Sequence, residues 1–200
     1  MLNKVKPWIF ALLLFVTALT GWSQTKQNTF LVSVGNNTIS MPSFKFNPLR
    51  PSFQVGFEKV WTQKKFSLVQ NFRAGYFYQR LVHHGVPIYT QLGYRYTFKF
   101  GLQAAAYLDA GYIHTFTDVQ VYKLNSNGEY ERAERAGRAH AMFGYSVLLS
   151  YPFKGKKIAF TPFIQHQFWM MTPFVKSYVP LLPNSAVHIG TYFTLNRSAK

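Results

Sequence analysis

The sequence contains no cysteine, so neither a disulfide nor a lipid-modified amino-terminal cysteine can hold or anchor this chain. Acidic residues are scarce, with six Asp and Glu against 22 Lys and Arg, a formal net charge of +16. After residue 24, no apolar run is long enough for a membrane-spanning helix. Aromatic residues, by contrast, make up 18% of the chain, whereas charged residues make up 14%. This composition predicts either a dense all-β core or a β-barrel that faces lipid.

The first 23 residues have the pattern of a secretory signal peptide. Lys4 and Lys6 precede an apolar run over residues 8–19, and the small residues Gly21 and Ser23 follow it. The run is short for a membrane-spanning anchor helix, which is the alternative reading. We expect a signal peptide over residues 1–23 and one barrel domain over residues 24–200. For an exported basic protein, anionic lipid is a better predicted partner than nucleic acid.

Residues 88–116 alternate in the way that long β-strands with one apolar and one polar face do. One face carries mainly apolar side chains: Ile88, Thr90, Leu92, Tyr94, Tyr96 and Phe98, then Leu102, Ala104, Ala106, Leu108, Ala110 and Tyr112. The other face carries Gln91, Arg95, Lys99, Gln103 and Asp109. Similar alternation recurs along the chain and predicts eight strands, over residues 29–35, 52–61, 66–80, 88–98, 102–116, 138–151, 158–169 and 185–195.

The connections between these segments alternate strictly between short and long. The short ones cover residues 62–65, 99–101 and 152–157, and the long ones cover residues 36–51, 81–87, 117–137 and 170–184. Outer-membrane barrels have short periplasmic turns and longer outer loops, and a sheet in lipid pairs all its backbone groups only by closing. The sequence therefore predicts an all-β fold, an eight-stranded antiparallel up-and-down transmembrane β-barrel with both termini in the periplasm.

Charged residues on the polar face are expected inside this barrel. Glu58, Arg73, Arg95, Asp109 and Arg138 would form a buried ionic network, because buried charges persist only when they are paired. The preferred interpretation is a structural plug that fills the interior. The functional alternative is a narrow conduit for small solutes, in which the net positive lumen favours anions.

The last predicted strand ends with a recognisable spacing. His188 is followed by Gly190 two residues on, then by Phe193 and Leu195, which resembles the terminal assembly signal of outer-membrane barrels. The chain departs from that signal by continuing over residues 196–200. In architecture the chain resembles the small OmpA/OmpX-like family of eight-stranded outer-membrane barrels. This resemblance implies a bacterial outer-membrane location and insertion by the barrel-assembly machinery, but it implies no activity.

Some small barrels of this kind are lipid A deacylases, which carry His-x-Ser on a lipid-facing strand near the outer rim. The corresponding residues here are His166, Gln167 and Phe168, so a phenylalanine stands at the nucleophile's position. Ser185 on the next strand could supply a hydroxyl. We interpret His166 instead as a rim residue that meets lipid headgroups. The pair His83 and His84 is expected in a solvated loop rather than at a metal site.

The predicted outer loop over residues 170–184 is apolar and rich in proline. It would either fold over the barrel mouth or dock a lipid or a partner protein. Candidate contacts are His166, Phe174, Tyr178, Leu181 and Leu182.

The leading hypothesis is a non-enzymatic outer-membrane barrel with a structural or interaction role. Its expected partners are the bilayer, lipopolysaccharide through the outer loops, and possible outer-membrane proteins, and no cofactor or metal is expected. The rival hypotheses are a lipid A- or phospholipid-modifying enzyme, a narrow channel, and a soluble lipocalin-like barrel with its apolar face inside.

Overall fold

The computed structural model describes residues 29–42, 49–62, 64–80, 82–118, 122–124, 128–132, 137–153, 155, 158–174 and 180–195. The signal peptide expected over residues 1–23 lies outside this range. The strands are β1 (Thr29–Thr38), β2 (Pro51–Val60), β3 (Phe66–Gln79), β4 (His83–Thr97), β5 (Gln103–Thr117), β6 (Tyr122–Leu124), β7 (Tyr130–Arg132), β8 (Arg138–Ser150), β9 (Ile158–Thr172) and β10 (Leu182–Leu195). The described part of the chain has no helix with the length and apolar character needed to span a bilayer.

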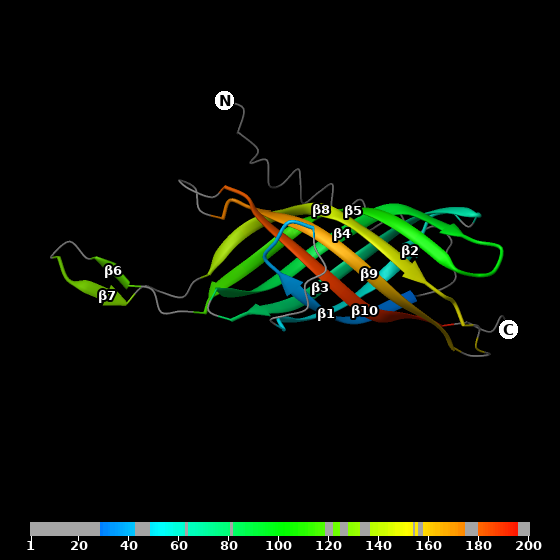
Figure 1. The fold of residues 1–200 in the computed structure, drawn as a ribbon, viewed down its shortest axis with the longest axis horizontal. Coiled ribbons are helices and arrows are strands. Elements are labelled where there is room, and N and C mark those ends of the chain that lie inside the picture. Colours follow the sequence, from blue (N-terminus) through cyan, green and yellow to red (C-terminus); the bar gives the residue numbers. More distant parts are fainter. Residues whose placement is uncertain are drawn as a thin grey trace, which may run out of the picture.

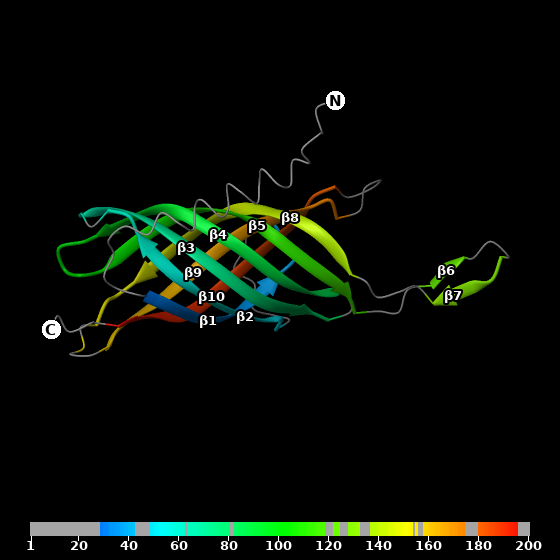
Figure 2. The same ribbon diagram turned by 180° about the vertical axis from the view of Figure 1, so that it is seen from behind.

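Eight of these strands form one closed barrel in the order β1-β10-β9-β8-β5-β4-β3-β2. Every neighbouring pair is antiparallel, and β1 closes the sheet by pairing with β10 from Thr29↔Thr194 to Thr38↔Ser185. The strands cross the barrel at a marked tilt to its long axis (Figures 1 and 2). The predicted fold class, an eight-stranded antiparallel barrel, is confirmed.

Several strands are longer than the alternation predicts, and one predicted loop is wrong. β4 begins at His83 rather than at Ile88, because residues 83–87 pair with β5 from His83↔Thr117 to Pro87↔Ile113. The connection between β3 and β4 is therefore a tight turn, not a long loop over residues 81–87. At the end of the barrel where β3 turns into β4, three other strands are also longer than predicted: β1 continues to Thr38, β9 continues to Thr172 and β10 begins at Leu182.

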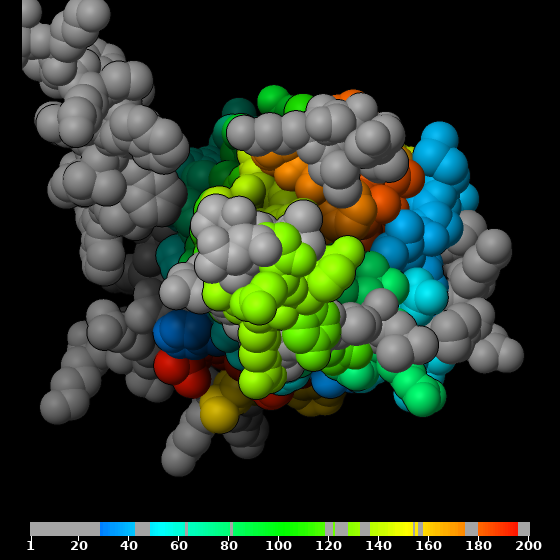
Figure 3. Space-filling model, turned by 90° about the vertical axis from the view of Figure 1, so that its left-hand side faces the viewer, coloured from blue at the N-terminus to red at the C-terminus, as the bar shows by residue number. Residues whose placement is uncertain are grey.

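The predicted solvated loop over residues 117–137 contains a small hairpin of its own. β6 and β7 form a separate two-stranded sheet, paired from Tyr122↔Arg132 to Leu124↔Tyr130. The hairpin stands away from the barrel at the end opposite to the last residues of β10 (Figure 1). An end-on view shows it in front of the barrel at that end (Figure 3). We call this the outer end, and the end with the short turns the turn end.

The barrel interior is arranged in three layers. Nearest the turn end lies an apolar cluster of Leu31, Val69, Ala105, Tyr107, Leu148, Phe163 and Tyr192. Nearest the outer end lies a second cluster of Phe77, Tyr89, Ile113, Met142, Trp169 and Met171. Buried polar side chains separate the two clusters, among them Gln54, Arg73, Gln91, Asp109, Ser146, Gln167 and His188. The order apolar, polar, apolar repeats along β3, β5, β8 and β9, so these four strands contribute to all three layers.

Candidate functional site: the polar interior and the apolar wall

The outward face of the barrel is covered with exposed apolar side chains. Leu108 and Ile189 are 73% and 63% exposed, respectively. Other exposed members of this wall are Phe30, Val32, Val34, Phe53, Val55, Phe57, Ile88, Leu92, Tyr94, Phe143, Tyr145, Val147, Leu149, Phe160 and Ile164. Large aromatic residues gather at the turn end, where Trp61, Phe66, Phe100 and Phe153 are exposed. Trp, Tyr and Phe at strand ends are typical of the girdles that meet membrane interfaces.

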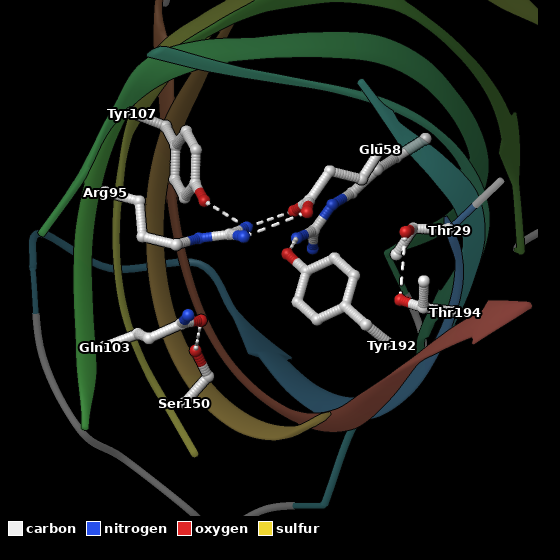
Figure 4. A network of polar contacts seen from close by, with 9 residues as sticks. Thr29, Glu58, Arg95, Gln103, Tyr107, Ser150, Tyr192 and Thr194 are labelled. Atoms are coloured by element: carbon white, nitrogen blue, oxygen red, sulfur yellow. Dashed lines mark hydrogen bonds and ion pairs between the residues drawn. The ribbon is translucent and has the colours of Figure 1, made fainter. Parts of the chain in front are cut away.

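Arg95 and Glu58 form an ion pair across the interior near the turn end. The Nη1 atom of Arg95 donates to Glu58 Oε1 at 2.9 Å, and its Nη2 atom contacts Glu58 Oε2. The same guanidinium reaches the hydroxyl of Tyr107 at 3.4 Å and lies over the ring of Tyr192. Figure 4 shows the two charged groups pointing toward each other within the ring of strands. Further hydrogen bonds of this kind help to offset the cost of taking two charges out of water.

Arg73 and Asp109 occupy the middle layer and are held mainly by neutral partners. Arg73, which is 2% exposed, donates to Gln54 Oε1 at 3.2 Å and to the hydroxyl of Tyr192 at 3.3 Å. The carboxylate of Asp109 accepts hydrogen bonds from Gln91 at 3.0 Å and from Gln167 at 2.8 Å, and also from Ser146. The structure thus resolves the expected ionic network into one ion pair and two hydrogen-bonded charges.

Arg138 does not join this interior network. It is the first residue of β8, lies opposite Thr115, and its side chain is exposed at the outer end. His140, two residues further along β8, is buried. Because side chains alternate along a strand, Arg138 lies on the same, inward-facing side of β8. The strand, however, extends past the closed interior, so Arg138 belongs to the outer rim.

A side chain from the β9–β10 connection packs on the outer end of the interior. Phe174 packs against the outer apolar cluster, and its ring centroid lies 6.0 Å from that of His83 and 6.4 Å from that of His140. His140 is fixed by Thr115 Oγ1 at 2.8 Å and by the carbonyl oxygen of Pro173 at 2.7 Å. The expectation that His83 lies in a solvated loop is wrong, because it is 4% exposed within β4.

The other expected contacts of this loop are distributed differently. Leu182 begins β10 and packs with Phe174 against the outer cluster, whereas Leu181 is 43% exposed. Tyr178 lies outside the described residues. Phe174 and Leu182 therefore contact the outer end of the interior, and whether the loop docks a lipid or a partner stays a prediction.

His166 and Ser185 meet on the outward face near the outer end. The Nε2 atom of His166 lies 2.9 Å from Ser185 Oγ, across the β9–β10 pair. The side chain of Ser185 is 1% exposed, and Phe168, directly opposite Ser185, is also buried. Sequence reasoning brought these two residues together as a rival hypothesis, and the structure places them within hydrogen-bonding distance.

The four residues of the expected assembly signal divide between the two faces of β10. His188 points inward, where its Nε2 atom lies 3.1 Å from Gln54 Nε2. Gly190 is required by close packing, because a Cβ atom there would lie 2.7 Å from Phe163 Cζ and 2.4 Å from the carbonyl oxygen of Val32. Phe193 and Leu195 are exposed on the wall.

Closure, an apolar wall and a polar middle layer are combined in this chain as they are in membrane barrels. The fold is a closed, eight-stranded antiparallel barrel with an apolar outward face. No protein-family model matches the sequence, and no curated protein does either.

Three similar solved structures are small barrels of this kind. Neisserial surface protein A is 8% identical over 86% of this chain and 96% of its own, with a TM-score of 0.47. The attachment invasion locus protein Ail of Yersinia pestis, in complex with the heparin analogue sucrose octasulfate, is 10% identical over 84% and 98%, with a TM-score of 0.45. The outer membrane enzyme PagL is 8% identical over 84% and 99%, with a TM-score of 0.42.

Sequence reasoning missed two features of this barrel. The inward-facing apolar residues, such as Val69, Leu148 and Phe163, were not assigned to the interior, although their alternation with outward residues was available as a signal. A set of histidines and aromatic side chains at the outer end was also missed. There Tyr76 bonds to His84 at 3.0 Å and Tyr112 bonds to His114 at 2.7 Å.

Proposed function

We propose that this protein is an integral outer-membrane β-barrel with a closed interior, which acts through its outer end by contact with lipopolysaccharide. The observation that carries the proposal is the polarity of the barrel, with apolar side chains exposed on the wall and charged side chains buried inside. A soluble barrel of the lipocalin kind would have the opposite arrangement. Placing this wall in lipid removes its apolar side chains from contact with water, which is energetically favourable.

The outer rim supports the lipopolysaccharide part of the proposal. Arg80 and Arg138 are exposed there, just beyond the outward pairs Tyr76–His84 and Tyr112–His114. Phenol and imidazole groups suit the boundary between acyl chains and headgroups. Guanidinium groups bind phosphates in a bidentate manner, and lipopolysaccharide presents phosphates at this level.

One experiment tests location and contact together. The protein refolded into vesicles is expected to migrate differently on gels with and without boiling, and added lipopolysaccharide should raise the temperature at which the folded band is lost. In the variant Arg80→Gln/Arg138→Gln the folded band should persist, but lipopolysaccharide should raise the temperature at which this band is lost by a smaller amount. Lys99→Gln, at the turn end, is the control. A soluble protein without a heat-shifted band contradicts the membrane location, and an undiminished effect in the double variant contradicts the contact.

The hydrogen bond between His166 and Ser185 supports a second candidate, an acyl hydrolase or acyl transferase acting on lipid. In that reaction Ser185 would attack an ester carbonyl while His166 takes its proton and passes it to the alcohol that leaves as the ester C–O bond breaks; water or a second alcohol would then release the acyl group from Ser185. The burial of Ser185 opposes this candidate, because an ester cannot reach a hydroxyl that is 1% exposed.

Lipid analysis separates the two candidates. Cells that produce Ser185→Ala should have the same lipid A and phospholipid acyl pattern as cells that produce the natural chain, and His166→Gln should behave alike. A lipid species that disappears in both variants, but not in Thr191→Ala further toward the turn end of the same strand as Ser185, would establish catalysis.

A further inference from the structure

The outward wall is hollowed over β2, β3, β4 and β5, which lie side by side in the barrel (Figure 2). A groove of about 430 Å³ opens there. Its outward lining side chains are Val55, Phe57, Phe72, Ala74, Ile88, Thr90 and Ala110. Its size falls within the range of about 300–1,000 Å³ that is typical of small-molecule sites.

The groove arises from small side chains placed among large ones. Phe57, Phe72, Thr90 and Ala110 lie in register across the four strands. The rings of Phe57 and Phe72 stack at 4.9 Å and form one side, while Thr90 and Ala110 leave room beyond them. On β8, in contrast, four successive outward residues are large: Phe143, Tyr145, Val147 and Leu149. A hollow of this kind on a lipid-facing wall fits an acyl chain.

A line of hydrogen bonds leads from the groove toward the turn end. Thr90 Oγ1 donates to the carbonyl oxygen of Asn71 at 3.1 Å and accepts from Gln70 Nε2 at 3.2 Å. The indole of Trp61 donates to Gln70 Oε1 at 3.3 Å. The ammonium group of Lys59 lies 3.9 Å from the centre of the Trp61 ring. Amide, indole and ammonium groups in this order match the ester and phosphate groups of a lipid above its acyl chain.

The charges around this line favour an anionic lipid. Lys64 and Lys65 are exposed in the turn that follows β2, so they lie at the same turn end as Lys59. Among the described residues, the carboxylates of Glu58 and Asp109 face the barrel interior, and the other acids lie at or beyond the outer end. No described carboxylate therefore competes with a phosphate at this corner of the turn end.

We propose that the groove over β2–β5 binds one anionic glycerophospholipid, with an acyl chain against Ala74 and Ala110 and the phosphate at Lys59. The site lies on the leaflet that faces the turn end. The inference rests on the proposed membrane location, and the test below separates its failure from the failure of that location.

The test uses the protein refolded into vesicles of equal phosphatidylglycerol and phosphatidylcholine. Native mass spectrometry after mild detergent release counts the lipids that each variant retains. Ala110→Phe fills the groove and should lower lipid retention about fivefold, roughly 1 kcal/mol. Ala106→Phe is the matched control, because Ala106 is exposed on the same face of β5 but does not line the groove. Lys59→Gln should abolish the preference for phosphatidylglycerol, whereas Lys99→Gln should keep it.

The outcomes are distinct. A protein that does not insert into vesicles overturns both the membrane location and the lipid site. A protein that inserts, but retains lipid equally in Ala110→Phe and Ala106→Phe, overturns the lipid site alone. An unchanged preference for phosphatidylglycerol in Lys59→Gln overturns the assignment of the phosphate to Lys59.

Discussion

Glu58 and Arg95 depend on each other because both are nearly excluded from solvent. Replacing one of them leaves the other charge buried without its partner, which typically costs about 3–5 kcal/mol. We expect Arg95→Met alone, or Glu58→Gln alone, to lower the free energy of unfolding by that order. The double variant should recover most of the loss. Urea titration of the folded barrel in vesicles measures both effects, and additive losses would contradict the coupling.

At the scale of residues, the sequence predicts which face a side chain takes but not its height in the barrel. Arg73 and Asp109 are buried, and the side chains of Glu58 and Arg95 are largely excluded from solvent, because alternation within a strand is strict. Arg138 follows the same alternation, yet it is exposed because β8 begins above the closed interior. The contact between Phe174 and the two histidines joins three separate elements, and no local pattern encodes it.

At the scale of single strands, the middle of β5 supplies a sharp test of the membrane-facing wall. Leu108→Arg places a charge on the exposed wall and should cost about 2–4 kcal/mol in a bilayer. Tyr130→Arg, in the hairpin, is the control, because Tyr130 is 77% exposed and Leu108 is 73% exposed. If Leu108→Arg lowers the free energy of unfolding and Tyr130→Arg does not, although both residues are equally exposed, the medium around β5 is lipid. The measurement is unfolding in vesicles, and equal stability of both variants argues against a lipid-facing wall.

The sequence predicts the eight barrel strands, but it does not predict where they begin and end at the outer end of the barrel. Gly85 and Pro87 are typical of turns, so residues 81–87 were expected to form a loop. Pairing with β5 overrides this local preference, since residues 83–87 complete the ladder up to Thr117. The hairpin of β6 and β7 lay within a polar stretch that lacks the alternation of a barrel strand, so nothing local distinguished it from irregular loop.

At the scale of the whole molecule, the two apolar clusters and the polar side chains between them predict that the barrel does not conduct. The cavity near Tyr89, Trp169 and His188 measures about 20 Å³, which is room for about one water molecule. The apolar clusters on either side add two further barriers to ions. We expect no stepwise current in planar bilayers from the natural chain or from Asp109→Asn. Current steps whose ion selectivity changes in Asp109→Asn would show that the interior opens.

The pairing of the first strand with the last also governs how the chain can fold. Thr29 and Thr194 lie 165 residues apart in sequence, and yet their hydroxyl groups are 3.0 Å apart. Leu31 and Tyr192 likewise share one cluster, so neither the sheet nor the core is complete before β10 is in place. Such long-range contacts slow folding, and unpaired strand edges promote aggregation in the meantime. Loss of β10 should therefore abolish the barrel as a unit rather than shorten it by one strand.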